Sequence, residues 1–275
     1  MTTSVAYAGG AAAHSAAAAE RLFPLDSELV ALGTFADVVD AAVDGGVAFG
    51  VLPIESSLAG PVAETHDLLF DSPLSIVAET SIPIRHHLVA RRALPLEHVR
   101  VVRSHPVALE QCRGLLRSLS GAKMIATSTT AEAAAQVAES IIPGEVAIAS
   151  ERAVRVYGLQ VIASDIGDHP EAFTRFVSVA THTRLDGSQT AWRTAFSFVT
   201  DHRAGALHAA IEPFARHGID LVQLVSRPIP HSPFNYRFDA VLAGHPLDPV
   251  TRAALTDVRA RVLRLRVFGS YPVGS

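Results

Sequence analysis

The stretch Thr174-Arg175-Phe176 closes a first region of the sequence in which short apolar segments alternate with helical ones. Alternation of this kind, from residue 4 to about residue 179, is typical of an α/β domain with a largely parallel sheet. We therefore expect a layered α/β fold for this region. The segments with the composition of strands are residues 5–7, 47–52, 99–102, 124–126, 146–149 and 176–179.

Helix starts are marked by capping residues. Thr34 and Asp37 have the spacing of a capping box at the start of residues 35–44, and the apolar side chains of this segment fall on one helical face. Thr129 and Glu132 repeat the same spacing before a second helical segment. These patterns predict two helices that each follow a strand.

A domain boundary is expected at residues 182–192, because this segment has no apolar period and contains Asp186-Gly187-Ser188-Gln189. The order after it is strand, helix, strand, strand, helix, strand, which is the ferredoxin-like pattern. The chain is therefore expected to divide into residues 1–181, a linker at 182–192, and residues 193–275. The expected elements of the second part are residues 195–199, 207–217, 220–226, 236–242, 249–262 and 265–268.

Composition excludes several classes of function. The 275 residues carry 23 basic and 27 acidic side chains, a net charge of −4, with no basic block that would follow a phosphate backbone, so nucleic acid is not an expected partner. No run approaches the roughly 20 apolar residues that cross a bilayer, so no membrane span is expected. The Ala-rich residues 11–19 have the composition of a helix. The single cysteine, Cys112, predicts a buried thiol in a reducing compartment, and a cytoplasmic location is expected.

Metal and nucleotide chemistry are poorly supported. The 13 histidines are scattered without the spacing of metal ligands, and His86-His87 is expected in a strand and at the surface. Gly9-Gly10 is followed by alanines, so it does not form a G-x-G-x-x-G phosphate loop. We expect no metal site and no bound nucleotide.

Hydroxyl side chains gather where strands are expected to lead into helices. Each is a candidate N-cap, and capping alone explains such a residue. Several helix N-termini that open onto one cleft would also bind carboxylates, because their free N–H groups and the helix dipole favour anions. Both interpretations stand at this point, and the second suits a small dianion. The residues are Ser15, Ser56, Ser57, Ser104, Ser128, Thr129, Thr130 and Ser150.

Five landmarks in one order resemble the prephenate dehydratase family. They are Pro53-Ile54-Glu55, Ser104-His105-Pro106, Thr174-Arg175-Phe176, Gly205-Ala206-Leu207-His208 and Ser226-Arg227-Pro228. The resemblance implies a bilobed catalytic domain like a type II periplasmic binding protein, followed by a ferredoxin-like ACT regulatory domain. It also implies the conversion of prephenate to phenylpyruvate in phenylalanine biosynthesis, without a cofactor.

The resemblance implies roles for residues of the first region. Thr174 is expected to donate a hydrogen bond to the departing hydroxide, and Phe176 belongs to the same motif. Arg175 has a fork that suits a carboxylate, but neighbours in a strand point to opposite faces, so one of Thr174 and Arg175 is expected to face the cleft. Glu55 is either an acid near the reaction or a structural carboxylate.

The sequence departs from the family where polar side chains are usual. Ala13, Val107 and Ala172 replace donors, and Ser56 replaces an amide. Loss of one hydrogen bond to a charged ligand costs about 1.5–3 kcal/mol. Two explanations compete: a prephenate dehydratase with a rebuilt pocket, or a relative recruited to another cyclic acid in specialised metabolism, in which His14 would be a new acid or base.

The second region implies regulation. By resemblance, Gly205, Ala206, Leu207 and His208 form an effector loop with Ser226, Arg227 and Pro228, and the effector is an amino acid such as phenylalanine. Val225 stands where a Glu is usual, so a domain that only joins subunits is an alternative. A homodimer or homotetramer is expected. A non-catalytic amino-acid sensor is the alternative of another class.

Overall fold

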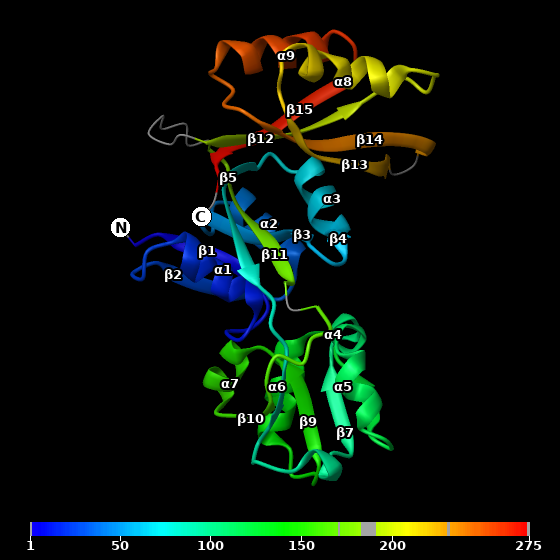
Figure 1. Cartoon of the computed structure of the whole chain (residues 1–275). Helices are drawn as coiled ribbons and strands as arrows, with labels where there is room; N and C mark the ends of the chain where they lie inside the picture. The colour runs from blue at the N-terminus through cyan, green and yellow to red at the C-terminus, as the bar shows by residue number, and fades with distance from the viewer. Residues whose placement is uncertain (1, 170, 183–190, 230–231, 274–275) are drawn as a thin grey trace.

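A computed structural model describes residues 2–169, 171–182, 191–229 and 232–273. Three units are stacked along the molecule (Figure 1): a first α/β lobe in the middle, a second α/β lobe below it, and a C-terminal unit above it. The expected α/β class with a ferredoxin-like second part is confirmed. None of the described helices is long and apolar enough to cross a membrane.

The first lobe is built on a mixed sheet of strand order β2-β1-β3-β11-β5, with the short β4 paired to β3. β1, β2 and β3 are parallel, but β11 is antiparallel to both of its neighbours, so the expected largely parallel sheet is wrong here. The chain leaves the lobe after β5 and returns in β11. This strand therefore runs opposite to β3 and β5, which lie on either side of it. The strands are β1 (Ser4–Ala8), β2 (Glu28–Leu32), β3 (Phe49–Ser56), β4 (Gly60–Pro61), β5 (Ser75–Pro83) and β11 (Phe173–Ala180).

Side-chain alternation gives this sheet two apolar faces. Val5 and Tyr7 of β1 pack with the buried alanines of α1 (His14–Leu22), whereas Ala6 and Ala8 pack on the opposite face. The helices on that second face are α2 (Phe35–Val43) and α3 (Ala63–Asp71). The capping box of Thr34 and Asp37 is present with both of its hydrogen bonds.

The second lobe has the strand order β10-β6-β9-β7-β8, in which β7 is parallel to both neighbours and β6 is antiparallel to both of its own. The chain crosses from the first lobe to this lobe between β5 and β6, and it returns between β10 and β11. Its elements are β6 (His87–Ala90), a 3₁₀ helix (Leu96–His98), β7 (Val101–Ser104), α4 (Pro106–Gln111), α5 (Arg113–Ser118), β8 (Lys123–Ala126), α6 (Thr130–Glu139), β9 (Glu145–Ala149), α7 (Glu151–Tyr157) and β10 (Gln160–Ala163).

Cys112 lies between α4 and α5 and is fully buried, which confirms the expected structural thiol. Burial raises the pKa of this thiol to about 12, with a smaller contribution from Asp168. The thiol is therefore protonated at neutral pH and is not a nucleophile.

The C-terminal unit is a four-stranded antiparallel sheet of order β13-β14-β12-β15, with both helices packed on one face. The βαββαβ order is confirmed. Most of the expected linker, residues 183–190, lies outside the described residues. The elements are β12 (Trp192–Val199), α8 (Ala206–Arg216), β13 (Leu221–Ile229), β14 (Ser232–Ala243), α9 (Pro249–Arg259) and β15 (Arg264–Pro272).

The free face of this sheet rests on the first lobe (Figure 1). Ala195, Val241 and Phe268 belong to the same buried cluster as Ile76 and Val177 of the first lobe. The two units therefore share one apolar core.

Candidate active site

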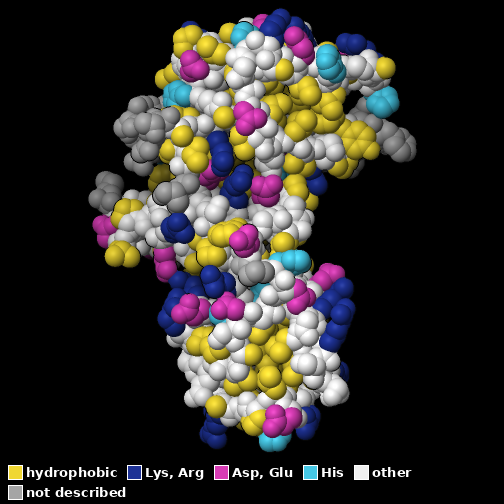
Figure 2. Space-filling view, viewed as in Figure 1, with side chains coloured by type: hydrophobic (Ala, Val, Ile, Leu, Met, Phe, Trp, Pro, Cys, Tyr) yellow, Lys and Arg dark blue, Asp and Glu magenta, His cyan; other side chains and the backbone are white. Residues whose placement is uncertain are grey.

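A cleft of about 620 Å³ lies between the two α/β lobes, with lining residues from both. The waist between the lobes is visible in Figure 2. Among its described lining residues none is Lys or Arg, and the ionisable ones are His14, Glu64, His86 and His105. A bound carboxylate would therefore meet neutral donors.

Six of the eight residues expected to bind substrate line the cleft. Ser15 and His14 open α1, whose N-cap Ala13 makes no side-chain hydrogen bond, so the first backbone N–H groups of this helix have no cap. Thr129 caps α6 and accepts a hydrogen bond from the Glu132 N–H at 3.0 Å. Two helix N-termini, one from each lobe, therefore face the same space. The lining residues of the expected set are His14, Ser15, Ser56, Ser128, Thr129 and Thr130.

The other two expected residues, Ser57 and Ser104, are not in the lining. The Ser57 hydroxyl accepts a hydrogen bond from the Phe173 N–H at 2.9 Å. The Ser104 hydroxyl is fully buried and donates to the Ile148 carbonyl at 2.8 Å. Both hydroxyls hold the backbone around the cleft in place.

The alternation expected in β11 is observed. Thr174 lines the cleft, whereas Arg175 points to the opposite face and pairs with Glu55 at 3.3 Å. Phe176 is buried in the core beneath α1. Of the four residues expected to be catalytic, the structure places Thr174 at the cleft and the other three away from its lining.

Arg175 and Glu55 lie instead beside the junction with the C-terminal unit. Arg175 lines a small cavity of about 20 Å³ together with His66 of α3 and Tyr271 of β15. Burial raises the pKa of the Tyr271 phenol. Arg175 therefore joins the strand that carries Thr174 to the C-terminal unit.

Five polar lining residues were not expected from the sequence as site residues: Thr34, Glu64, His86, His105 and Gln111. The expected surface position of His86-His87 is wrong, because both side chains are buried where the chain crosses between the lobes. His86 Nε2 lies 2.8 Å from Gln111 Oε1. No pattern of apolar spacing marks such a crossing, and the two adjacent histidines predicted a surface strand instead.

His14 and His86, which both line the cleft, are neutral at neutral pH. Burial, with a smaller effect of His86, lowers the pKa of His14 to about 4. Burial also lowers the pKa of His86, against the opposing effect of its bond to Gln111. Neither His14 nor His86 therefore adds a positive charge to the described lining at neutral pH.

The expected effector residues fall into two places. Ala206 and Leu207 line a pocket of about 390 Å³ with Arg203, Tyr236 and Phe238, and Gly205 and His208 flank them in sequence. Arg227, in contrast, does not line that pocket. It pairs with Asp67 of α3 at 2.9 Å. Ser226 and Pro228 are exposed on the other face of β13.

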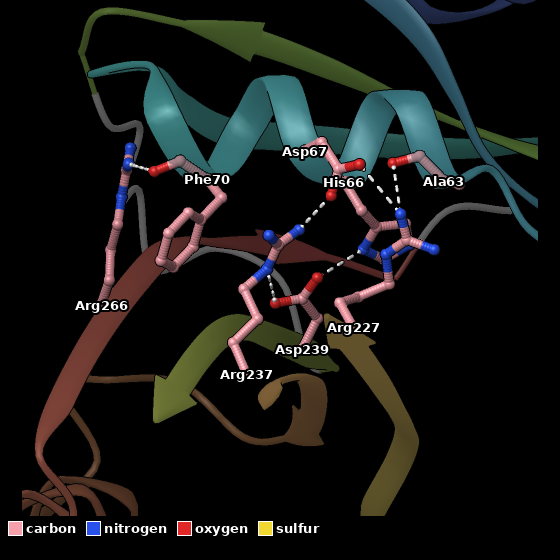
Figure 3. A network of polar contacts seen from close by, with 8 residues as sticks. All are labelled: Ala63, His66, Asp67, Phe70, Arg227, Arg237, Asp239 and Arg266. Carbon is pink, nitrogen blue, oxygen red and sulfur yellow. Dashed lines mark hydrogen bonds and ion pairs between the residues drawn. The ribbon is translucent and has the colours of Figure 1, made fainter. Parts of the chain in front are cut away.

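A network of ion pairs joins the C-terminal sheet to α3 (Figure 3). Arg237, only 1% exposed, donates to Asp67 at 2.6 Å and to Asp239 at 3.3 Å. Asp239 also lies 3.1 Å from His66 Nδ1, and Arg266 donates to the Phe70 carbonyl. Because α3 begins next to the cleft, where Val62 and Glu64 line it, this network connects the C-terminal unit to the cleft.

Comparisons with known proteins agree on one family. The family model described as prephenate dehydratase matches residues 5–184. An arogenate dehydratase/prephenate dehydratase of Arabidopsis thaliana is 36% identical over 98% of this chain and 72% of its own length. A bifunctional chorismate mutase/prephenate dehydratase of Aquifex aeolicus is 33% identical over 98% of this chain and 73% of its own.

Two solved structures have nearly the same fold over the whole chain. A prephenate dehydratase from Arthrobacter aurescens, in complex with L-Phe, is 28% identical with a TM-score of 0.89, covering 98% of this chain and 90% of its own. GqqA, described as a novel type of quorum quenching acylase, is 29% identical with a TM-score of 0.86, covering 98% and 97%.

Proposed function

This chain belongs to the prephenate dehydratase family, and from that premise we propose that its cleft converts prephenate to phenylpyruvate, carbon dioxide and water. The enzyme is a carbon–oxygen lyase of phenylalanine biosynthesis. The observation that carries the proposal is the position of Thr174 in a cleft onto which helix N-termini of both lobes open.

The helix N-termini suit the two carboxylates of prephenate. The N-terminus of α1 lies in the first lobe and that of α6 in the second, so each lobe offers N–H groups and hydroxyls to one carboxylate. Binding a dianion between them holds the lobes in one relative position. Substrate orientation follows, because both ends of the molecule are fixed.

Thr174 supports departure of the hydroxyl group. Loss of carbon dioxide sends an electron pair into the ring as the C–O bond breaks, and aromatisation drives both events. Negative charge develops on the leaving oxygen, and a hydroxyl donor placed there stabilises it. Thr174 is too weak an acid to give up its proton at neutral pH, so its role is hydrogen bonding.

A second candidate substrate is a related cyclic acid. Ala13, Val107 and Ala172, which stand where the family usually has donors, all line the cleft. Their side chains widen the cleft and remove hydrogen bonds. Arogenate, which two of the most similar relatives are named for, is the first such acid to test.

The test is phenylpyruvate formation from prephenate at neutral pH, with a no-enzyme control because prephenate aromatises spontaneously in acid. Thr174→Ala is expected to lower kcat by about 10²- to 10³-fold, as for loss of one donor to a developing oxyanion, and Thr174→Ser to retain most of it. Thr256→Ala, at an exposed position of α9, is the matched control. No turnover of prephenate by folded wild type sinks the proposal; turnover of arogenate instead selects the second candidate.

Regulation by phenylalanine is proposed for residues 193–275 as an ACT domain, following residues 1–181 and the linker 182–192. The pocket beside Ala206 and Leu207 supports it, and homodimers or homotetramers would complete the site. L-phenylalanine added to the same assay is expected to change kcat or KM. Binding of phenylalanine without turnover of any cyclic acid favours the non-catalytic amino-acid sensor.

A cytoplasmic location is proposed on the basis of the single buried Cys112.

A further inference from the structure

Two imidazoles in the cleft have no part in the chemistry described so far. His14 is the first residue of α1 and is half-buried, and its side chain makes no hydrogen bond within the part of the chain that the structure describes. It stands where the family usually has Phe. The His14 imidazole is therefore available to a ligand.

His86 is held beside it by a different contact. Gln111 Oε1 is an acceptor, so the Nε2 of His86, 2.8 Å away, carries the proton of the neutral ring. The Nδ1 lone pair of His86 is buried and has no hydrogen-bond partner among the described residues. One basic nitrogen thus lies unused at the lining of the cleft.

The groups around this pair do not supply a compensating positive charge. The other ionisable lining residues are Glu64 at the start of α3 and His105 at the start of α4. His87 adjoins His86 and lowers its pKa, and the Tyr157 hydroxyl lies beside Gly10. Arg152 is paired with Glu20 and also donates to the Ala11 carbonyl. The His14–His86 pair is neutral in the empty cleft mainly because of burial, with a smaller lowering of the pKa of His14 by His86 and of the pKa of His86 by His87.

The reaction consumes one proton. Prephenate is a dianion, and loss of carbon dioxide and hydroxide leaves the phenylpyruvate monoanion; one proton converts the hydroxide to water. Thr174 has no proton to spare at neutral pH. The proton must therefore come from a group that solvent can recharge.

We propose that the His14–His86 pair takes up one proton from solvent when the dianionic substrate binds, and that His14 delivers it to the departing hydroxyl oxygen. The inference rests on the proposed function. As the C–O bond breaks, its electron pair goes to oxygen, which accepts the proton from the His14 imidazolium. The carboxylate leaves as carbon dioxide, its bonding pair completes the aromatic ring, and His14 returns to its neutral form. His86 is a positioning residue, held by Gln111.

Substrate charge makes this uptake favourable. An anion within about 4–6 Å of an imidazole raises its pKa by roughly 1 to 3 pH units. Two carboxylates in a cleft whose described lining has no Lys or Arg therefore bring His14 from a pKa of about 4 toward neutrality. The empty site is uncharged, and the occupied site is an acid.

The pH dependence of turnover tests the proposal, with prephenate as substrate from pH 6 to pH 8 and a no-enzyme correction at each pH. Because the free enzyme must gain a proton, kcat/KM is expected to fall about tenfold per pH unit over this range. The kcat value, which reports the complex, is expected to fall with a midpoint at a higher pH.

Variants separate a proton donor from a structural histidine. His14→Gln and His14→Phe are expected to lose about 10²-fold or more in kcat/KM at pH 6 and to show flat profiles. His86→Gln is expected to keep the slope. His98→Gln, an exposed histidine in the 3₁₀ helix of the second lobe, is the matched control and is expected to follow wild type.

The outcomes are distinct. A flat kcat/KM in an active wild type, or an unchanged slope in both His14 variants, overturns the inference and leaves the proposed function standing. Absence of prephenate turnover in wild type overturns both.

Discussion

Two histidines at the cleft, His14 and His86, make the stability of the protein depend on pH. His14, with a pKa of about 4, and His86, with a lowered pKa, are neutral when folded, whereas both bind protons below about 6.5 when unfolded. The unfolded state therefore binds more protons between pH 6.5 and pH 4, and the free energy of unfolding falls as the pH falls through that window.

Each histidine is expected to contribute up to about 1.4 kcal/mol per pH unit to this loss. Urea denaturation of wild type and His14→Phe at pH 7 and pH 5 measures it, and the variant should lose less stability between the two pH values. His98→Gln serves as the exposed control. Equal losses in wild type and His14→Phe would contradict the folded-state pKa of His14.

For single residues, the sequence predicted which face of an element a side chain lies on better than it predicted which side chains pair with each other. Alternation in a strand required Thr174 and Arg175 to face opposite sides, and the structure shows which faces the cleft. The pairing of Arg175 with Glu55 depends on strand register, which no local pattern encodes. The burial of His86 depends on the chain crossing between lobes, so its polar character alone predicted the surface.

Helix α3 is the element that joins the C-terminal sheet to the cleft. His66 and Asp67, successive residues of α3, bind Asp239 and Arg237 of β14 (Figure 3). Burial, which raises the pKa of Asp239, is outweighed by the hydrogen bond from His66 and the charge of Arg237, so this pKa is lowered. The Asp239 carboxylate is therefore ionised in the folded protein, and it accepts hydrogen bonds from both His66 and Arg237.

Asp239→Asn is expected to lower the free energy of unfolding by about 2–4 kcal/mol, because the buried Arg237 loses half of its compensation. Urea denaturation at pH 7 measures this cost. Glu151→Gln removes an exposed pair with Arg155 and should cost less than about 0.5 kcal/mol. A cost for Asp239→Asn no larger than that of this control would show that the network contributes nothing to the interface.

Among the elements, those with strong local signals were predicted and those without were missed. The capping box of Thr34 is present, and Thr129 caps α6, although the Glu132 carboxylate accepts from the Ser128 N–H rather than completing the box. Strands β2, β4, β5 and β10 were not predicted, and of β6 only the strand position of His87 was. β2 and β10 are half-exposed edge strands, and edges lack the two-sided burial that marks a central strand.

Over the whole molecule, the first lobe and the C-terminal unit are expected to behave as one body. Their shared cluster contains Ile76 and Val177 from one unit and Ala195, Val241 and Phe268 from the other. The second lobe has separate clusters and is joined by two stretches of chain. Relative motion is therefore expected at the cleft, where substrate is proposed to bind, and not at the junction with the C-terminal unit.

Gly269 of β15 permits that junction. A Cβ at this position would overlap the Ile76 carbonyl oxygen of β5 and lie 2.8 Å from the Ile76 nitrogen, and the backbone has a φ of +148°, which other residues rarely adopt. Backbone atoms cannot move aside as the tip of a flexible side chain can. The C-terminal sheet and the sheet of the first lobe must therefore separate. Gly269→Ala is expected to cost about 3 kcal/mol or more, the sum of backbone strain and lost packing.

The measurement is urea denaturation combined with hydrogen exchange of β12 and β14. In wild type these strands should exchange with the same free energy as β1 and β3 of the first lobe, because the core is common. In Gly269→Ala they should exchange more readily than β1 and β3. Gly46→Ala, where a Cβ meets only an ordinary contact of 3.4 Å, is the control. Unchanged exchange in Gly269→Ala would mean that the close approach of β15 to β5 does not hold the units together, and the ion pairs of α3 would then be the main link between the C-terminal unit and the cleft.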